Sequence, residues 1–278
     1  MEQGKKYKDG LFRDYFGDKE RLMSLINALL KLNITDVDEI EINTLEGVFF
    51  GNLKNDLSCI VQNKLIFITE AQSTPNPNMP ARMLFYGTEL IKDYLSKANK
   101  KLYGANLVKL AAPKFFVIYT GKREEPLYSE LSLKDAFLDE CTLDLKVKVI
   151  NINSKNASRF LKKSLPLKDY TLFLRLVRKF EKKGTSRPDA IRAAIKYAIG
   201  NDIMSEYLKT REAEVFNMVG FEWNEEEAKA YWKQEILEDT RLSDIKNLMT
   251  NMKLSPDKAM DALAVPLAER KKYANALS

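Results

Sequence analysis

Two short apolar segments with a polar turn between them constrain the fold of this chain most. Residues 57–61 and 65–68 are apolar at almost every position, and Gln62, Asn63 and Lys64 separate them. Apolar runs of this length that end at turn residues predict strands, and a strand that is apolar on both faces is typical of a sheet covered on both sides. We therefore expect an antiparallel hairpin inside a buried central sheet.

The same hairpin would bring two carboxylates together. If Val61 pairs with Leu65, Asp56 lies opposite Glu70, because the numbers of paired residues in an antiparallel ladder have a constant sum. Directly opposed Cβ atoms lie roughly 4.5–5.5 Å apart, so the two charges would repel unless a cation lay between them. Gln72 shares a face with Glu70, since side chains two apart on a strand point the same way. Such oxygen ligands suit a hard divalent cation; the alternative is that these are solvated strand-end and loop residues.

The absence of histidine excludes several classes of enzyme. The chain has no histidine and two cysteines in 278 residues. The usual Ser-His-Asp, Cys-His and HExxH hydrolases and the zinc deaminases are therefore excluded. Cys59 and Cys141 are too few and too far apart for a zinc cluster, and we expect both to be reduced thiols. No GxxxxGK[ST] or GxGxxG phosphate loop occurs, which argues against a nucleotide-driven enzyme.

The order of predicted elements divides the chain into two parts. Apolar periodicity predicts a helix at 19–32, a half-buried strand at 40–42, the hairpin, a helix at 80–97, and strands at 115–119 and 143–152. Residues 121–141 are expected to form an insertion or a peripheral helix. Beyond residue 158 helices are expected at 169–183, 186–200, 202–219, 224–237 and 240–252, with a short one from 255. The prediction is a mixed α/β core over 1–157 followed by an all-helical region over 158–278.

Composition indicates a globular chain, with 45% hydrophobic and 30% charged residues. No apolar run approaches the roughly 20 residues that a membrane-spanning helix needs. The first nine residues are polar and carry no hydrophobic signal region. We expect a cytoplasmic protein with no membrane partner.

The excess positive charge lies in the second part. Residues 1–150 carry 21 basic and 21 acidic residues, whereas residues 155–196 carry 13 basic and 3 acidic ones. Such a concentration is typical of contact with a phosphate backbone, which adds affinity without sequence preference; the alternative is a solvated helix face. The candidates for nucleic-acid contact here are Lys162, Lys163, Arg175, Arg178, Lys182, Lys183 and Arg187.

A helix over 80–97 would place Arg82 and Tyr86 on one face, because they are four residues apart. Asn78 could cap this helix, and Pro80 suits its first turn. The two side chains could bind a phosphate or orient a metal ligand. Alternatively, Tyr86 belongs to the core and Arg82 pairs with a surface acid.

Several short motifs, in this order along the chain, resemble the PD-(D/E)XK nuclease superfamily. The resemblance is to its Rpn-like branch of recombination-promoting nucleases and PD-(D/E)XK nuclease family transposases. The predicted order of helix, three strands, helix and strand is also similar to the core of that superfamily. The motifs are Asn55-Asp56, Ile68-Thr69-Glu70-Ala71-Gln72-Ser73, Pro80-Ala81-Arg82 and Tyr86, with further likeness at Lys8-Asp9, Leu11-Phe12 and Ala213-Glu214-Val215.

The resemblance implies a role for each matching residue near the hairpin. Asp56 and Glu70 would bind Mg²⁺ or Mn²⁺, with the backbone carbonyl of Ala71 as a further ligand. Gln72, the third catalytic candidate, stands where the wider superfamily has Lys, although the Rpn-like branch is similar in using Gln. A neutral amide can orient the attacking water but cannot offset negative charge in the transition state. Glu20 on the first predicted helix is an additional candidate ligand, and its alternative is a solvated glutamate.

The function implied is a divalent-metal-dependent DNA endonuclease linked to recombination, mobile elements or defence. Arg82 and Tyr86 would point toward the acids and hold a phosphate. The competing interpretation is a nuclease-fold module that binds DNA or a protein partner with little or no turnover, for which Gln72 is the main ground. A homodimer would supply two active sites for a concerted double-strand break, and the sequence leaves the oligomeric state open.

Overall fold

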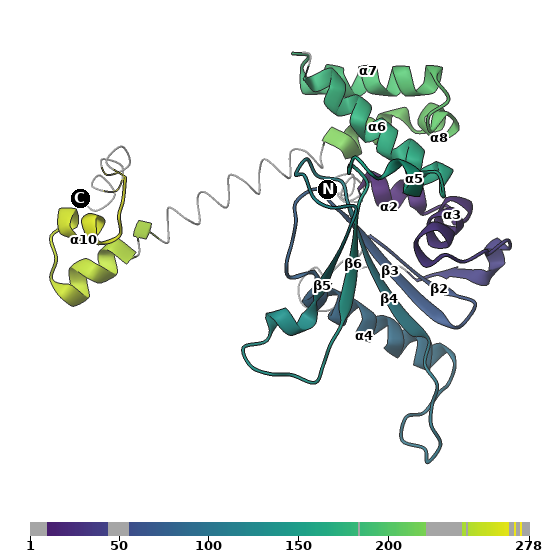
Figure 1. Ribbon diagram of the computed structural model, residues 1–278, viewed down its shortest axis with the longest axis horizontal. Helices are drawn as coiled ribbons and strands as arrows, with labels where there is room; N and C mark the ends of the chain where they lie inside the picture. The colour runs from purple at the N-terminus through teal and green to yellow at the C-terminus, as the bar shows by residue number, and fades with distance from the viewer. Residues whose placement is uncertain are drawn as a thin grey trace, which may run out of the picture. The chain divides into compact units, whose positions relative to one another are not determined.

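A computed structural model describes residues 10–43, 56–182, 184–220, 241–242, 244–266, 270 and 273 (Figure 1). The chain divides into two compact units, one up to Gly220 and one from Phe221. Within the described residues, no helix is long and apolar enough to cross a bilayer. Each unit is taken by itself below.

The first unit is built on a six-stranded mixed sheet with the order β1-β2-β3-β4-β6-β5. The hairpin β2–β3 and the edge pairs β1–β2 and β5–β6 are antiparallel, whereas β3, β4 and β6 are parallel neighbours. Parallel neighbours need a crossover, and helix α4 supplies the one between β3 and β4. The strands are β1 Ile40–Ile42, β2 Leu57–Val61, β3 Leu65–Gln72, β4 Ala112–Tyr119, β5 Tyr128–Ser132 and β6 Lys146–Asn151.

The hairpin has the predicted register, because Val61 pairs with Leu65 and Leu57 with Thr69. Its turn is closed by the Lys64 amide, which donates to the Val61 carbonyl oxygen at 3.0 Å. Gln62 and Asn63 both have positive φ angles, 52° and 51°, as the type I′ turns of tight hairpins require. Glu39 holds Gln62 in that conformation, since its carbonyl accepts the Gln62 amide and its carboxylate accepts the Gln62 side chain.

One face of the sheet packs against helix α4, which spans Met79–Lys97. Ile66 and Ile68 of β3 contact buried residues of α4 such as Met83 and Leu90. A Cβ added to Gly87 would lie 3.0 Å from the Phe115 ring, so a glycine at this position lets the helix lie close to β4. The even-numbered residues of β3 therefore face α4, and this parity carries Glu70 and Gln72 to the same face.

The opposite face carries Phe67 and Phe116, whose ring centroids are 5.5 Å apart. Figure 1 shows α2 and α3 on the side of the sheet away from α4. Buried aromatic rings join these N-terminal helices to the helices after the sheet: Phe12 contacts Tyr170 at 5.6 Å between centroids, and Tyr15 contacts Tyr207 at 5.0 Å. Among the described residues, the first unit contains the helices α2 Leu11–Phe16, α3 Lys19–Leu30, α4, α5 Ser158–Leu161, α6 Leu165–Glu181, α7 Arg187–Gly200 and α8 Ser205–Thr210, and residues 212–220 are also helical.

Three predictions about secondary structure were wrong in detail. The helix predicted over 202–219 is interrupted: α8 covers Ser205–Thr210, Arg211 has a φ of −133°, and residues 212–220 are helical again. Residues 121–141 are neither an insertion nor a peripheral helix; they contain the edge strand β5 and the short 3₁₀ helix Leu133–Ala136. Helix α6 begins at Leu165 instead of 169, because the Ser164 hydroxyl caps it by accepting from the Leu167 amide. The predicted helix over 224–237 lies outside the described residues.

The second unit has a small hydrophobic core of its own. Ile245, Ala259, Met260, Val265 and Tyr273 are buried together in it. Its helix α10, Pro256–Ala262, begins as predicted at Ser255, whose side chain accepts from the Lys258 amide. Residues 221–278 carry 9 basic and 11 acidic residues, so the positive excess of the chain belongs to the first unit.

A chain that ends at Gly220 is expected to fold on its own, because it forms a compact unit with a buried hydrophobic cluster made of its own residues. Its thermal unfolding midpoint should stay within about 3 °C of that of the first unit in the full chain. Near-ultraviolet circular dichroism and calorimetry measure this. A chain that ends at Glu181 is the matched control: it loses α7, which packs on α6, and should unfold without cooperativity. Loss of cooperativity in the Gly220 chain would contradict the prediction.

Candidate functional site

The candidate site lies where the parallel strands end. Glu70, Ala71 and Gln72 are the last residues of β3, and Gln72 pairs with Tyr119 at the end of β4. Tyr119 in turn pairs with Asn151 at the end of β6. The carboxyl edge of parallel strands is where open α/β sheets bind their ligands.

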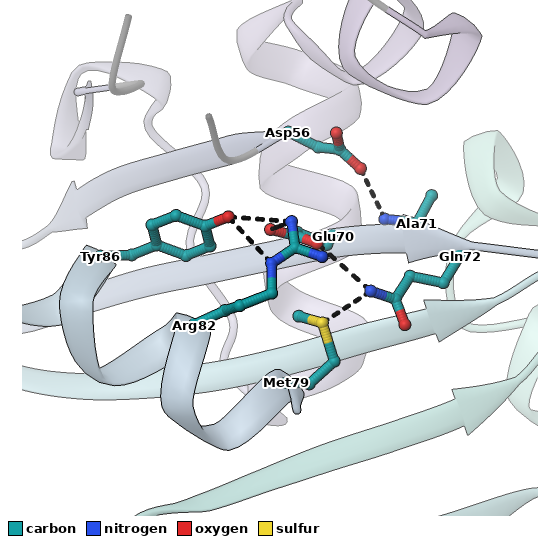
Figure 2. A network of polar contacts seen from close by, with 7 residues as sticks. All are labelled: Asp56, Glu70, Ala71, Gln72, Met79, Arg82 and Tyr86. Atoms are coloured by element: carbon teal, nitrogen blue, oxygen red, sulfur yellow. Dashed lines mark hydrogen bonds and ion pairs between the residues drawn. The ribbon is translucent and has the colours of Figure 1, made fainter. Parts of the chain in front are cut away.

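Asp56 directly precedes β2 and reaches β3 across the hairpin. Its Oδ2 accepts a hydrogen bond from the Ala71 amide at 2.7 Å, as Figure 2 shows. The last ladder pair is Leu57 with Thr69, so Asp56 occupies the next position, opposite Glu70. The hairpin therefore brings the two acids together as the constant-sum argument predicts.

Glu70 is buried, although it is acidic, and only 4% of its surface is exposed. Its Oε1 accepts from the Arg82 guanidinium at 3.0 Å, and its Oε2 accepts from the Gln72 amide at 3.4 Å. Burial, together with the negative charge of Asp56, raises the pKa of Glu70 to about 7, even though Arg82 and the hydrogen bonds from Tyr86 and Gln72 act in the other direction. The raised pKa shows that the Arg82 guanidinium offsets only part of the cost of holding Glu70 ionised beside Asp56.

Helix α4 delivers Arg82 and Tyr86 to the acids. The Tyr86 hydroxyl accepts from both Nε and an Nη of Arg82, at 3.3 and 2.9 Å. Tyr86 is buried, as the alternative for this residue required, yet its hydroxyl lies in the polar network (Figure 2). Arg82 does pair with an acid, but that acid is the buried Glu70 and not one on the surface.

The side-chain amide nitrogen of Gln72 contacts two neighbouring side chains. The amide donates to Glu70 and to the Met79 sulfur, the latter at 2.6 Å. Met79 is the first residue of α4. The sulfur contact therefore ties the end of β3 to the start of that helix, and a methionine in this role was not predicted because nothing in its sequence context marks it.

The residues at the hairpin end fit a hard divalent cation. Two carboxylates stand at opposed positions of the hairpin, and the carbonyl of Ala71 lies on the same side of β3 as its amide, toward Asp56. No third acidic, histidine or cysteine residue joins them among the residues that the structure describes. Glu20 is exposed in the first turn of α3 and stands outside this group.

Two of the predicted basic residues reach the same edge of the sheet from α6. Arg175 donates to the Ile152 carbonyl at 2.8 Å, and Arg178 donates to the Thr120 carbonyl. The Thr120 amide donates to the Gln72 carbonyl at 2.7 Å, so a short chain of hydrogen bonds links Arg178 to the site. Burial lowers the pKa of Arg175. Both guanidinium groups hold strand ends in place, a role that the charge count did not reveal.

The other basic candidates lie before or after α6, which has 17 residues and is therefore roughly 24 Å long. Lys162 and Lys163 are exposed just before the helix, and Lys182 is exposed just after it. Arg187 forms an ion pair with Glu181 at 3.3 Å. Lys183 lies outside the described residues.

Two residues that the sequence did not single out complete this edge. The Asn153 amide donates to the carbonyls of Thr120 and Gly121, at 2.7 and 3.0 Å. A Cβ added to Gly121 would lie well under 3.0 Å from the Ser73 carbonyl oxygen and the Tyr119 hydroxyl. The glycine after a predicted strand was an available signal, whereas no local pattern distinguishes Asn153.

Comparison with known proteins agrees with the family that the sequence resembles. A family model described as PD-(D/E)XK nuclease family transposase matches residues 6–216. No curated protein and no solved structure gave a match. The match covers well over half of the chain, spans the sheet, the hairpin acids and helices α2 to α8, and ends before the second compact unit. The predicted α/β class, with a mixed sheet flanked by helices and followed by a helical region, is confirmed, and the chain belongs to the PD-(D/E)XK nuclease family transposases.

Proposed function

We propose that this protein is a divalent-metal-dependent endonuclease that hydrolyses phosphodiester bonds of DNA. The observation that carries the proposal is the buried acid Glu70 with the partly buried acid Asp56 at the opposed position of the hairpin, at the carboxyl edge of the sheet. Burying a carboxylate beside a second negative charge is costly unless a cation compensates them. Membership of a nuclease family makes phosphodiester hydrolysis the reaction for which such a site is suited.

Mg²⁺ or Mn²⁺ bound there would polarise a phosphate oxygen and lower the pKa of a bound water. Asp56 and Glu70 would hold the ion, and the Ala71 carbonyl would add a neutral ligand. The Gln72 side chain has a carbonyl oxygen that can accept a hydrogen bond from the attacking water while its nitrogen stays bound to Glu70 and Met79. Arg82 contributes the positive charge that Gln72 lacks.

DNA contact is proposed along the edge of the sheet and helix α6. Lys162, Lys163 and Lys182 are exposed and free to follow a phosphate backbone, with the affinity but not the specificity that such contacts give. Arg175 and Arg178 would act in part by fixing the strand ends. The division of roles at residue 158, with cleavage before it and DNA affinity after it, is part of this proposal, as are a cytoplasmic location and a dimer with two active sites.

The second candidate is a module of the same fold that binds DNA with little turnover. One observation favours it: the Gln72 nitrogen donates inward, to Glu70 and Met79, and no lysine occupies that position. Such a module would keep its metal and its DNA affinity but would cut slowly.

Nicking of supercoiled plasmid separates the two candidates. The native chain is expected to nick DNA with Mg²⁺ or Mn²⁺ and to stop when EDTA is added. Asp56→Asn should reduce the rate at least about tenfold, because it removes one charged ligand of the ion. The variant is isosteric, and its amide oxygen can still accept the Ala71 amide, so its unfolding midpoint should change little.

The control for loss of one negative charge is Asp135→Asn, which should cut at the native rate. Asp135 is an exposed acid of the short helix Leu133–Ala136. Equal cutting by the native chain and Asp56→Asn would show that the named site is wrong. Binding of DNA without cutting, unaffected by Asp56→Asn, would favour the second candidate.

A further inference from the structure

The Arg82 side chain forms an ion pair with Glu70, one of the two hairpin acids. One Nη lies 3.0 Å from Glu70 Oε1, and the Glu70 side chain is only 5% exposed. Arg82 also interacts electrostatically with Asp56. The negative charges of Glu70 and Asp56 both raise the pKa of Arg82. One guanidinium thus offsets part of two negative charges.

Arg82 is fixed in this place by a second contact. Tyr86, one turn further along α4, is buried, and its hydroxyl accepts from Nε and Nη of Arg82. The same hydroxyl hydrogen-bonds to Glu70. Arg82, Tyr86 and Glu70 therefore form a closed polar triangle at the position where a metal ligand is needed (Figure 2).

Binding of a divalent cation to Glu70 conflicts with this triangle. A cation that coordinates Glu70 Oε1 would lie within a few ångströms of the guanidinium, and like charges at about 4 Å repel by several kcal/mol at the intermediate dielectric of a protein edge. The Arg82 side chain can give way, because 34% of it is exposed. Glu70 and Tyr86 cannot, because both are buried.

We propose that Arg82 is an internal counter-cation of the Asp56–Glu70 pair, that metal binding breaks its ion pair with Glu70, and that the released guanidinium then binds a phosphate of the DNA. The inference rests on the proposed function, since it requires the metal to bind at these acids. Arg82 is a positioning residue before metal binding and a phosphate ligand after it. A guanidinium suits both roles, because it pairs equally well with carboxylate and phosphate oxygens.

The affinity for Ca²⁺, measured by titration calorimetry at pH 8, tests the inference without any cleavage. Arg82→Gln removes the competing charge and is expected to bind Ca²⁺ about tenfold more tightly than the native chain. Arg82→Lys keeps the charge and should bind within about threefold of the native value. Lys92→Gln removes one charge from an exposed position of the same helix, where Lys92 pairs with Glu89, and controls for the change in net charge.

DNA binding gives the second readout. Ca²⁺ should strengthen DNA binding by the native chain and by Lys92→Gln, and should strengthen it much less in Arg82→Gln, which has no guanidinium to release. Nuclear magnetic resonance gives a third readout, which is measured on the native chain and uses a variant only to assign the signal. The Nε–H signal of Arg82, assigned by its absence in Arg82→Lys, should shift when Ca²⁺ saturates the site.

The outcomes distinguish failure of the proposed function from failure of the counter-cation role alone. If Asp56→Asn does not weaken Ca²⁺ binding, or if neither the native chain nor Arg82→Gln binds Ca²⁺, the proposed function fails and this inference fails with it. If binding depends on Asp56 but Arg82→Gln binds Ca²⁺ equally or more weakly, only the counter-cation role is overturned. An unshifted Nε–H signal in the Ca²⁺-saturated native chain overturns it as well.

Discussion

Replacing Glu70 by glutamine is expected to abolish cleavage and, at the same time, to stabilise the metal-free protein at pH 8. Cleavage should fall by roughly 10²- to 10³-fold, the scale for loss of one charge-bearing group at an active centre. The stability gain has a different cause. Glu70 is buried beside Asp56, so its ionised form is unfavourable in the folded protein, and a neutral amide of the same shape avoids that cost.

The pH dependence of the unfolding free energy follows from the raised pKa of Glu70, which is about 7 in the folded protein and 4.5 without the fold. Below pH 4.5 Glu70 is protonated in both states and has no effect. Between pH 4.5 and 7 the unfolded chain releases this proton while the folded protein retains it, so stability declines as the pH rises. Above pH 7 the loss is complete, at about 3 kcal/mol.

Urea unfolding in EDTA at pH 5 and pH 8 measures this effect. The native chain should lose stability between the two values, and Glu70→Gln should lose about 2 kcal/mol less. Glu89→Gln is the control and should follow the native chain, because Glu89 is a half-exposed acid of α4 that pairs with Lys92. A Glu70→Gln protein that is less stable than the native chain at pH 8 would show that the ion pair with Arg82 outweighs the cost of burial.

Replacing Gly121 by alanine is expected to lower the stability of the protein more than a methyl group added at any other position along this edge of the sheet. The added Cβ would lie under 3.0 Å from the Ser73 carbonyl oxygen, the Tyr119 hydroxyl and the Tyr119 ring. All three belong to residues at strand ends, because Ser73 follows β3 and Tyr119 ends β4, and the Ser73 oxygen is a backbone atom that cannot move freely. Overpacking of this kind costs about 1–3 kcal/mol, and we expect the upper end of that range.

The same clash should also impair cleavage. The backbone of Ser73 must move away from the added methyl group, and Ser73 directly follows Gln72. The unfolding free energy from urea titration and the nicking rate at 20 °C below the unfolding midpoint check the two effects separately. Gly104→Ala is the matched control, since its Cβ would meet nothing nearer than 3.8 Å in an exposed segment. A Gly121→Ala protein within about 0.5 kcal/mol of the native chain would show that the strand ends yield more easily than their contacts suggest.

Some elements were predictable because their cause is local. The register of the hairpin follows from two apolar segments and a three-residue turn, and it placed Asp56 opposite Glu70 without any knowledge of the rest of the fold. Helix α4 was predictable because its apolar face repeats at helical spacing and Pro80 suits its first turn. The edge strand β5 was missed because Tyr128, Ser129 and Glu130 are exposed and supply no apolar alternation.

The amino-acid sequence by itself determined the central hairpin, its paired acids and the separation of a mixed core from a helical continuation, because these depend on spacing along one segment. Only the tertiary structure decided what surrounds the acids. Arg82 and Met79 come from α4, and Arg178 reaches the Thr120 carbonyl across 58 residues of sequence. The physical reason is that burial and charge compensation depend on which strand ends and helices meet at one edge, and no single segment of sequence encodes that meeting.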